Sequence, residues 1–278
     1  MKLSVITINY NNAVGLRKTM ESVTRQTFAD FEYIVIDGGS TDGSAEIIRE
    51  YADKVSYWVS EPDRGIYHAM NKGVKAARGE YCALLNSGDI YVDEQVLERM
   101  FSQGVTADIA VGDMISDNGN VMRAPEEVTM MFLMRGSLAH PASFTRRSLL
   151  LEHPFNEQSK ILGDHDFFMY ALVKMNASYQ RLEGIVSVFD LTGISSTTKR
   201  YSDSELQILR DTENAILCPR VRADYDSWMG KKDEYHRLFY TLSYSKNRKL
   251  VYRLVVFLLK ICMLNKGFIK DFHIRAKV

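Results

Sequence analysis

The sequence is short of proline, cysteine and net charge, and each shortage excludes a class of protein. Among its 278 residues are only 5 prolines and no low-complexity tract, which argues against a disordered chain. The 3 cysteines, Cys82, Cys218 and Cys262, are odd in number and far apart, which fits a reducing compartment and no zinc site. The 35 Lys and Arg are balanced by 35 Asp and Glu, a composition that does not favour a dedicated nucleic-acid binder.

Long apolar runs are missing as well. Residues 1–12 contain one Lys, no apolar stretch of signal-peptide length and no small-residue cleavage site, so we expect a strand at this end. The apolar stretch 250–264 is too short, and too interrupted by Arg253 and Lys260, to span a bilayer. We therefore expect a cytoplasmic globular protein, long enough for one large α/β domain with a helical appendage.

The first 90 residues alternate between strand and helix patterns. Strands are predicted over 3–9, 31–37, 55–60 and 81–85, and helices over 13–25, 44–51 and 66–78. This alternation is typical of a mostly parallel sheet covered by helices. Right-handed crossovers would bring the loops after the first, second and fourth strands to one edge, where open α/β sheets bind ligands.

The later residues follow a less regular order. They predict helices over 92–101, 126–134 and 167–174, strands over 107–112, 141–145 and 178–189, an Asn-Gly hairpin turn at 117–120, and helix from 202 onward. The strand-end loops contain no G-x-G-x-x-G or G-x-x-x-x-G-K-[ST], so neither a dinucleotide site nor a P-loop is supported. The N-S-G-D of residues 86–89 places an amide and a carboxylate at the end of a central strand, although an ordinary turn has the same residues.

Seven segments in order resemble one family. They are V-I-T-I-N-Y-N (5–11), Q-T-F (26–28), V-I-D-G-G-S-T-D-G (35–43), E-P-D-R-G-I-Y-H-A-M-N-K-G (61–73), A-R-G-E-Y (77–81), L-N-S-G-D (85–89) and G-D-H-D-F-F (163–168). The set resembles the family 2 inverting glycosyltransferases, above all bacterial members that build surface polysaccharides. The resemblance implies a GT-A fold over 1–200, with a nucleotide-sugar half over about 1–113 and an acceptor half over about 114–200. The residues that follow do not share the resemblance, and their helical pattern predicts a helical extension over 201–278.

The activity that this resemblance implies is transfer of a sugar from a nucleoside-diphosphate sugar to the hydroxyl of a saccharide or lipid-linked saccharide. Thr7, Asn9 and Tyr10 would edge the base pocket. Asp37 would accept a hydrogen bond from the imide N–H of the base, which favours UDP, dTDP or GDP over CDP, with UDP preferred. Asp37 could instead organise the following turn, and many family members have a second carboxylate where this chain has Gly38.

The diphosphate would lie near the helix that follows residue 65. Asp63 and Arg64 precede this helix, and an Arg suits a diphosphate, although a solvated loop charge is the alternative. By the family match Asn71 faces the site, whereas His68, which replaces a common Asp, is expected to be structural.

Residues 86–89 occupy the place of the family's D-x-D metal motif. Only Asp89 is acidic there, so it is the expected ligand of Mg²⁺ or Mn²⁺, together with substrate phosphates. The metal would stabilise charge on the leaving oxygen. Asn86 and Ser87 are expected to contact the donor.

Asp164 aligns with the family's catalytic base, although it could also cap the helix that follows. His165 is a weaker rival for the base. His140 is a candidate for the acceptor or diphosphate side, and a structural loop histidine is the open alternative.

The C-terminal segment 231–278 is basic, with twelve Lys or Arg against three Asp or Glu, a net charge of +9. Its apolar stretch 250–264 resembles an interfacial amphipathic helix that would contact the inner face of the membrane. Packing on the catalytic domain or in a homodimer is the alternative. Two other functions stay open: a catalytically weak nucleotide-sugar-binding scaffold, suggested by the single acid at 86–89, and a nucleotidylyltransferase, which lacks the expected Gly-rich basic loop.

Overall fold

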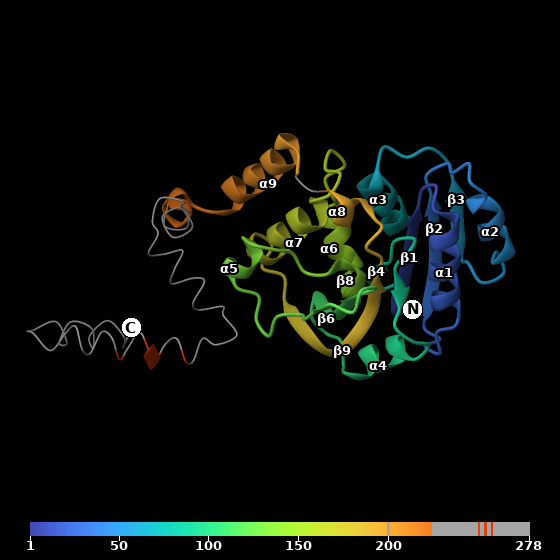
Figure 1. Cartoon of the computed structure of the whole chain (residues 1–278), viewed down its shortest axis with the longest axis horizontal. Coiled ribbons are helices and arrows are strands. Elements are labelled where there is room, and N and C mark those ends of the chain that lie inside the picture. The colour runs from blue at the N-terminus through green and yellow to red at the C-terminus, as the bar shows by residue number, and fades with distance from the viewer. Residues whose placement is uncertain (199–200, 224–249, 251–252, 255–256, 258–278) are drawn as a thin grey trace, which may run out of the picture. The chain divides into compact units, whose positions relative to one another are not determined.

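The computed structural model describes residues 1–198, 201–223, 250, 253–254 and 257, which belong to two compact units. The first unit, Met1–Ile216, contains the sheet and the predicted site residues (Figure 1). The second, Leu217–Val278, is described at 217–223 and at four further residues. Most of the apolar stretch 250–264 therefore lies outside the described residues, and the domain division at residue 200 stays a prediction.

The described residues of the first unit form a nine-stranded sheet in the order β3-β2-β1-β4-β8-β6-β9-β5, with β7 beside β6. The strands are β1 (Leu3–Asn9), β2 (Phe31–Asp37), β3 (Tyr57–Ser60), β4 (Tyr81–Leu84), β5 (Ile90–Tyr91), β6 (Ile109–Ser116), β7 (Val121–Met122), β8 (Ser143–Arg146) and β9 (Tyr179–Phe189). β1 to β4 are parallel, whereas β8 is antiparallel to β4 and β6 and joins the two halves. This arrangement confirms the predicted α/β fold.

Helices cover both faces of the sheet (Figure 1). The helices of the first unit are α1 (Ala13–Thr24), α2 (Ser44–Glu50), α3 (Ile66–Ala76), α4 (Val96–Ser102), α5 (Met130–Leu133), α6 (Arg147–Glu152), α7 (Gly163–Val173), α8 (Ile194–Thr197) and α9 (Asp203–Ile216). Val5 of β1 packs in a cluster with residues of α1, α2 and α4, and Ile6 packs in a second cluster with residues of α3, α6 and α7. Because successive side chains point to opposite faces and both faces are covered, every residue of β1 is buried.

Some elements differ in length from the prediction. The helix predicted over 126–134 is only α5, because the hydroxyl of Thr129 accepts the backbone N–H of Phe132 at 3.2 Å and caps the helix there. α7 begins at Gly163, four residues before its predicted start, and α6 and β5 were not predicted. The Asn-Gly turn at 117–120 is confirmed as the link between β6 and β7.

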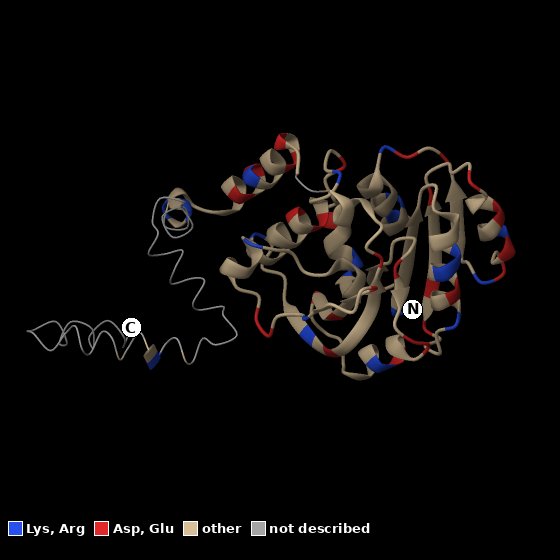
Figure 2. Ribbon diagram, viewed as in Figure 1, with Lys and Arg blue, Asp and Glu red and all other residues tan. Residues whose placement is uncertain are grey.

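The outer helices of the first unit have interspersed acidic and basic residues (Figure 2). Arg17 pairs with Glu50 at 2.7 Å, and Arg49 pairs with Glu46 at 3.0 Å. Exposed pairs of this kind add little stability. Among the described residues, no helix has the length and apolar character needed to cross a membrane.

Candidate active site

A cavity of about 1330 Å³ lies at the carboxyl ends of β1 and β4, where parallel α/β sheets bind ligands. Its walls come from the strand-end loops, the start of α3, the segments before α7 and after β9, and α9. The predicted site residues that line it are Asn9, Tyr10, Asp63, Asn86, Ser87, Asp89, His140, Asp164 and His165. Four others, Thr7, Asp37, Arg64 and Asn71, do not line it.

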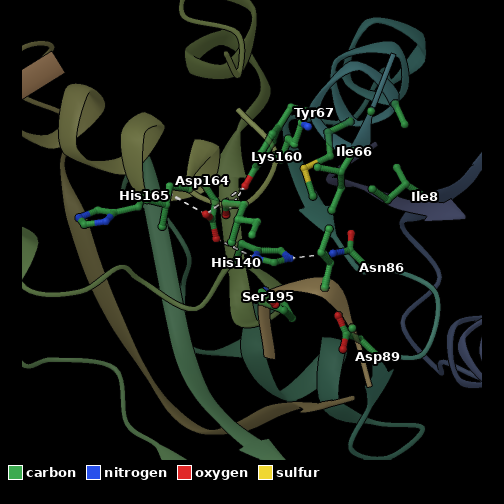
Figure 3. Close-up of a pocket in the computed structure, with 18 of the residues that line it drawn as sticks. Ile8, Ile66, Tyr67, Asn86, Asp89, His140, Lys160, Asp164, His165 and Ser195 are labelled. Atoms are coloured by element: carbon green, nitrogen blue, oxygen red, sulfur yellow. Dashed lines mark hydrogen bonds and ion pairs between the residues drawn. The ribbon is translucent and has the colours of Figure 1, made fainter. Parts of the chain in front are cut away.

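Asp164 lies in the first turn of α7 and faces the cavity (Figure 3). It is not the N-cap, because the helix begins one residue earlier and Leu162 is the capping position. Its Oδ2 lies 3.0 Å from Nδ1 of His140, and its Oδ1 accepts the backbone N–H of His165 at 2.9 Å. Burial acts to raise the pKa of Asp164, but the hydrogen bond and charge of His140 outweigh it and lower the pKa. The carboxylate is therefore ionised at neutral pH.

His140 connects Asp164 to the turn at the end of β4 (Figure 3). Burial acts to lower the pKa of His140, but the hydrogen bond to Asp164 and its charge raise it overall. The side-chain amide of Asn86 lies 3.2 Å from Nε2 of His140, and Oδ1 of Asn86 is buried with no partner among the described residues. A charged imidazole donates from both nitrogens, so the Nε2–H of His140 requires the amide orientation in which Oδ1 of Asn86 faces it.

The turn at 86–89 is held in place by α1. The hydroxyl of Thr19 donates to the carbonyl of Asp89 at 2.7 Å and accepts the backbone N–H of Gly88 at 2.9 Å. Asn12 donates to the carbonyl of Ser87 at 3.0 Å. Because Thr19 is fully buried, these bonds fix the turn in one position relative to the sheet.

A second carboxylate lies beside Asp89. The backbone N–H of Asp190, the residue after β9, donates to Oδ1 of Asp89 at 2.9 Å. Gly88 has φ of 109°, and a Cβ there would come within 2.5 Å of Oδ2 of Asp190, so only glycine leaves room for this carboxylate. Burial raises the pKa of Asp89 to about 7, and the charge of Asp190 also acts to raise it. Both acids line the cavity.

Asp37 is fully buried and organises the turn after β2. Its Oδ1 accepts from Nδ2 of Asn9 at 2.7 Å and from Oγ of Ser40 at 2.6 Å. Its Oδ2 accepts from the backbone N–H of Ser40 at 3.0 Å and from Oγ of Ser60 at 2.6 Å. Burial acts to raise the pKa of Asp37, but these hydrogen bonds outweigh it and lower the pKa. Asp37 thus takes the turn-organising role that the sequence left open.

Asp63, after β3, lines the cavity. Its Oδ1 accepts from Nζ of Lys72 at 2.8 Å and lies 2.9 Å from Nδ1 of His68. Its Oδ2 is buried and has no partner among the described residues. His68 thus contacts Asp63, in the structural position expected of it.

Four other predicted residues have their side chains engaged elsewhere. Thr7 is buried, and its hydroxyl accepts from Tyr33 at 3.0 Å. Arg64 is 70% exposed and pairs with Glu157. The amide of Asn71 bonds both backbone groups of Phe155. The imidazole of His165 contacts the carbonyl of Leu133 and points away from Asp164 (Figure 3). Asn71 therefore does not face the cavity, and His165 is poorly placed as a base.

The chain matches the model of a known protein family. Residues 4–168 match the family model described as Glycosyl transferase family 2, which is more than half of the 278 residues. The chain belongs to glycosyl transferase family 2. It is therefore a glycosyltransferase, as its motifs predicted.

Two mycobacterial glycosyltransferases are similar to this chain. A PGL/p-HBAD biosynthesis glycosyltransferase of Mycobacterium tuberculosis is 30% identical over 171 residues, 59% of this chain and 67% of that protein. An uncharacterized glycosyltransferase of the same species is 31% identical over 203 residues, 70% of this chain and 77% of that protein.

Solved structures show the same fold. S. aureus TarS in complex with UDP-GlcNAc has a TM-score of 0.64 at 22% identity, over 76% of this chain and 65% of that chain. The mannosyltransferase PcManGT from Pyrobaculum calidifontis, in complex with GDP-Man and Mn²⁺, has a TM-score of 0.54 at 15% identity, over 93% of this chain and 85% of that chain. These likenesses confirm the GT-A fold.

Family 2 enzymes with this fold commonly use a divalent metal. In the described residues, no group of three or more His, Cys, Asp and Glu side chains is placed to hold one. The neighbouring carboxylates of Asp89 and Asp190 nevertheless fit a hard cation, which in phosphate-transferring sites takes one or two carboxylates and completes its shell with phosphates and water.

Sequence reasoning missed several residues of this family 2 site. Asp190 follows the predicted strand 178–189, so the strand-end rule that selected Asp89 could have found it. Leu206 and Leu209 of α9 line the cavity although α9 lies beyond the family match. No local signal reveals them, because their place depends on how α9 packs.

Proposed function

We propose that the chain is an inverting glycosyltransferase that moves a sugar from a nucleoside-diphosphate sugar, with UDP favoured, to an acceptor hydroxyl. The observation that carries this proposal is the ionised carboxylate of Asp164, which faces the cavity and is bonded to His140. An ionised base at this place can take the proton of an acceptor hydroxyl as it attacks. One base and one in-line displacement invert the sugar carbon.

The other side chains along the cavity would bind different parts of the donor. Asn86, whose amide adjoins His140, and Ser87 would contact the sugar or ribose of the donor. Tyr10, which is 68% exposed at the end of β1, offers an aromatic face to the base. The donor would thus extend from the base pocket near Asn9 to the catalytic carboxylate of Asp164.

Asp89 and Asp190 would hold the Mg²⁺ or Mn²⁺. Such an ion supplies positive charge that stabilises the leaving diphosphate. The support is the hydrogen bond from the backbone of Asp190 to the carboxylate of Asp89 and the room that Gly88 leaves for the carboxylate of Asp190. The same pair weakens the scaffold alternative, since the single acid of residues 86–89 was its motive.

We propose a saccharide or lipid-linked saccharide of cell-surface polysaccharide biosynthesis as the acceptor. One of the two mycobacterial relatives is named for PGL/p-HBAD biosynthesis, which supports a biosynthetic role for the transfer. Leu206 and Leu209 of α9 add apolar surface to the cavity. The basic segment 231–278 suits peripheral contact with the inner face of the membrane, and a second copy of the chain is its alternative partner.

The test is a thermal-shift panel of nucleotides and nucleotide sugars, with and without Mn²⁺, followed by transfer assays on the stabilising donor. Asp164→Asn should lose transfer and keep nucleotide binding, because the amide cannot take the proton. Normal transfer by this variant would refute the base assignment. No stabilisation by any nucleotide would refute the proposed donor class.

A further inference from the structure

Two buried oxygens at the nucleotide end of the cavity have no hydrogen-bond partner among the described residues. They are Oδ1 of Asn9 and Oδ2 of Asp63. Both residues line the cavity; Asn9 is 4% exposed, and the side chain of Asp63 is 8% exposed. Buried acceptors in native proteins are nearly always paired, so their exceptions require an explanation. A ligand that donates N–H groups at this place supplies one.

Asp37, the acid expected to recognise the base, cannot take this role. Its two oxygens already accept four hydrogen bonds, from Asn9, twice from Ser40, and from Ser60. The residue is fully buried and does not line the cavity. Reaching a base would require breaking the turn that it organises.

The contacts of Asp63 engage only one of its two oxygens and leave Oδ2 free. Lys72 and His68 occupy only Oδ1, which fixes the rotation of the carboxylate. A Cβ built on Gly38 would lie 3.5 Å from Oδ2 of Asp63 and 3.1 Å from Cδ2 of Tyr10. A carboxylate oxygen and an aromatic ring therefore flank one small space, and Gly38 leaves it open.

We propose that Asp63, and not Asp37, recognises the base of the donor nucleotide, by accepting the N–H of its Watson–Crick edge on Oδ2. This inference rests on the proposed function. The ligand class is a nucleoside diphosphate with uracil, thymine or guanine, each of which has a ring N–H. Cytosine has an unprotonated ring nitrogen at the same position, so it brings an acceptor against the carboxylate and is rejected.

The first test compares UDP with CDP by isothermal titration calorimetry in the wild type and in Asp63→Asn. The amide can donate to cytosine, so we expect UDP affinity to fall at least about tenfold and the preference for UDP over CDP to disappear. Glu61→Gln is the matched control. Glu61 also pairs with Lys72, at 2.7 Å, but is 56% exposed and does not line the cavity, so this variant should keep the preference.

The second test needs no variant. UDP methylated at the imide nitrogen should bind the wild type at least about tenfold more weakly than UDP, because the methyl group replaces the donated hydrogen. UDP methylated at ring carbon 5 keeps that hydrogen and should bind like UDP.

The outcomes separate this inference from the proposed function. Wild-type protein that binds none of these nucleotides contradicts the proposed function. Wild-type protein that prefers UDP, with the preference kept in Asp63→Asn or with no effect of imide methylation, overturns the role of Asp63. An equal fall for UDP and CDP in Asp63→Asn also overturns it, because that pattern means a structural role only.

Discussion

Asp164 and His140 determine each other's charge. Burial alone acts to neutralise both side chains, by raising the pKa of the acid and lowering that of the histidine. The 3.0 Å contact between Oδ2 and Nδ1 reverses both shifts. His140 therefore keeps the carboxylate of Asp164 ionised, which is a positioning role if Asp164 is the proposed base, and its other nitrogen reaches Asn86.

Replacing His140 should move the pH profile of transfer. In His140→Gln the carboxyl of Asp164 loses its cationic partner, so burial dominates and its pKa rises. A base with a raised pKa is protonated over a wider acidic range, so the acidic limb of kcat/KM should move to higher pH. We expect at least about tenfold loss at pH 6 and a smaller loss at pH 8.

His165→Gln is the control for that profile. Its imidazole contacts the carbonyl of Leu133, and its charge lowers the pKa of Asp164 less than that of His140 does, so the variant should move the acidic limb less than His140→Gln. An unmoved limb in His140→Gln would show that Asp164 does not depend on His140.

Asp190→Asn should weaken metal binding. The variant keeps the backbone bond to Asp89 and removes one charge from the pair. Because ligand charge tunes affinity for hard cations, Mn²⁺ affinity in the presence of UDP should fall about tenfold or more, as measured by electron paramagnetic resonance of free Mn²⁺. Asp117→Asn is the control: Asp117 accepts from the backbone of Leu191 at 3.5 Å but does not line the cavity. Equal Mn²⁺ affinity in the two variants would exclude Asp190 as a ligand.

The site residues could be predicted from the sequence where they follow the ends of parallel strands. Asn86 and Asp89 were found in this way, and both line the cavity. Asp37 obeys the same rule, but its oxygens are occupied by Ser40 and Ser60. The sequence cannot show this, since the hydrogen bonds depend on how two neighbouring turns fold onto each other.

At the level of elements, the strands and helices of the first half were predicted because each is buried in a regular pattern. β1 alternates between the two faces of the sheet, and α1 presents Leu16, Met20 and Val23 to one of them. α7 was predicted to begin too late, because Gly163 and the acids after it resemble a loop. Its early start is stabilised by contacts with α9, which is distant in the sequence.

α9 contacts the segment before α7 through the buried carboxylate of Glu205. It accepts the backbone N–H groups of residues 160, 161 and 162 at 2.5, 3.1 and 2.9 Å, and the hydroxyl of Ser159 at 2.8 Å. Burial acts to raise the pKa of Glu205, but these bonds lower it overall. The segment that leads into α7 is thus fixed by one side chain of α9.

Glu205→Gln should destabilise the first unit. The amide loses the negative charge and leaves at least one buried N–H without an acceptor, so we expect a loss of about 2–3 kcal/mol in the free energy of unfolding, measured in urea. A lowered folded pKa means that the stabilisation of Glu205 is present above its unfolded pKa and is lost as pH falls through the folded value. The difference between wild type and variant should therefore shrink in acid.

Asp211→Asn on the same helix is the matched control for Glu205→Gln. Asp211 is exposed and accepts one bond from Gln207 at 2.7 Å, so its replacement should change stability by less than about 0.5 kcal/mol. Equal effects of the two variants would mean that the carboxylate of Glu205 does not anchor α9.

At the scale of the whole molecule, the two ends of the cavity arise in different ways. The end proposed for the nucleotide is made by loops after β1, β2 and β3, which are close in sequence and were predictable from the motifs. The end proposed for the acceptor includes Leu206 and Leu209 of α9, beyond the region that matches the family model. A family motif cannot predict this wall, because its residues lie outside the matched region.

The net charge of the chain differs in sign before and after residue 231. Residues 1–230 have a net charge of −9, and residues 231–278 have +9. Each Lys or Arg near an anionic membrane contributes about 1 kcal/mol of attraction, an effect that salt screens.

Removing residues 246–278 should therefore abolish binding to vesicles that contain anionic lipid, in a cosedimentation assay, and leave UDP affinity unchanged. The full chain should lose vesicle binding between low salt and about 0.5 M salt. Equal binding by the truncated and full chains would exclude membrane contact through this segment, and salt-independent binding would exclude an electrostatic cause.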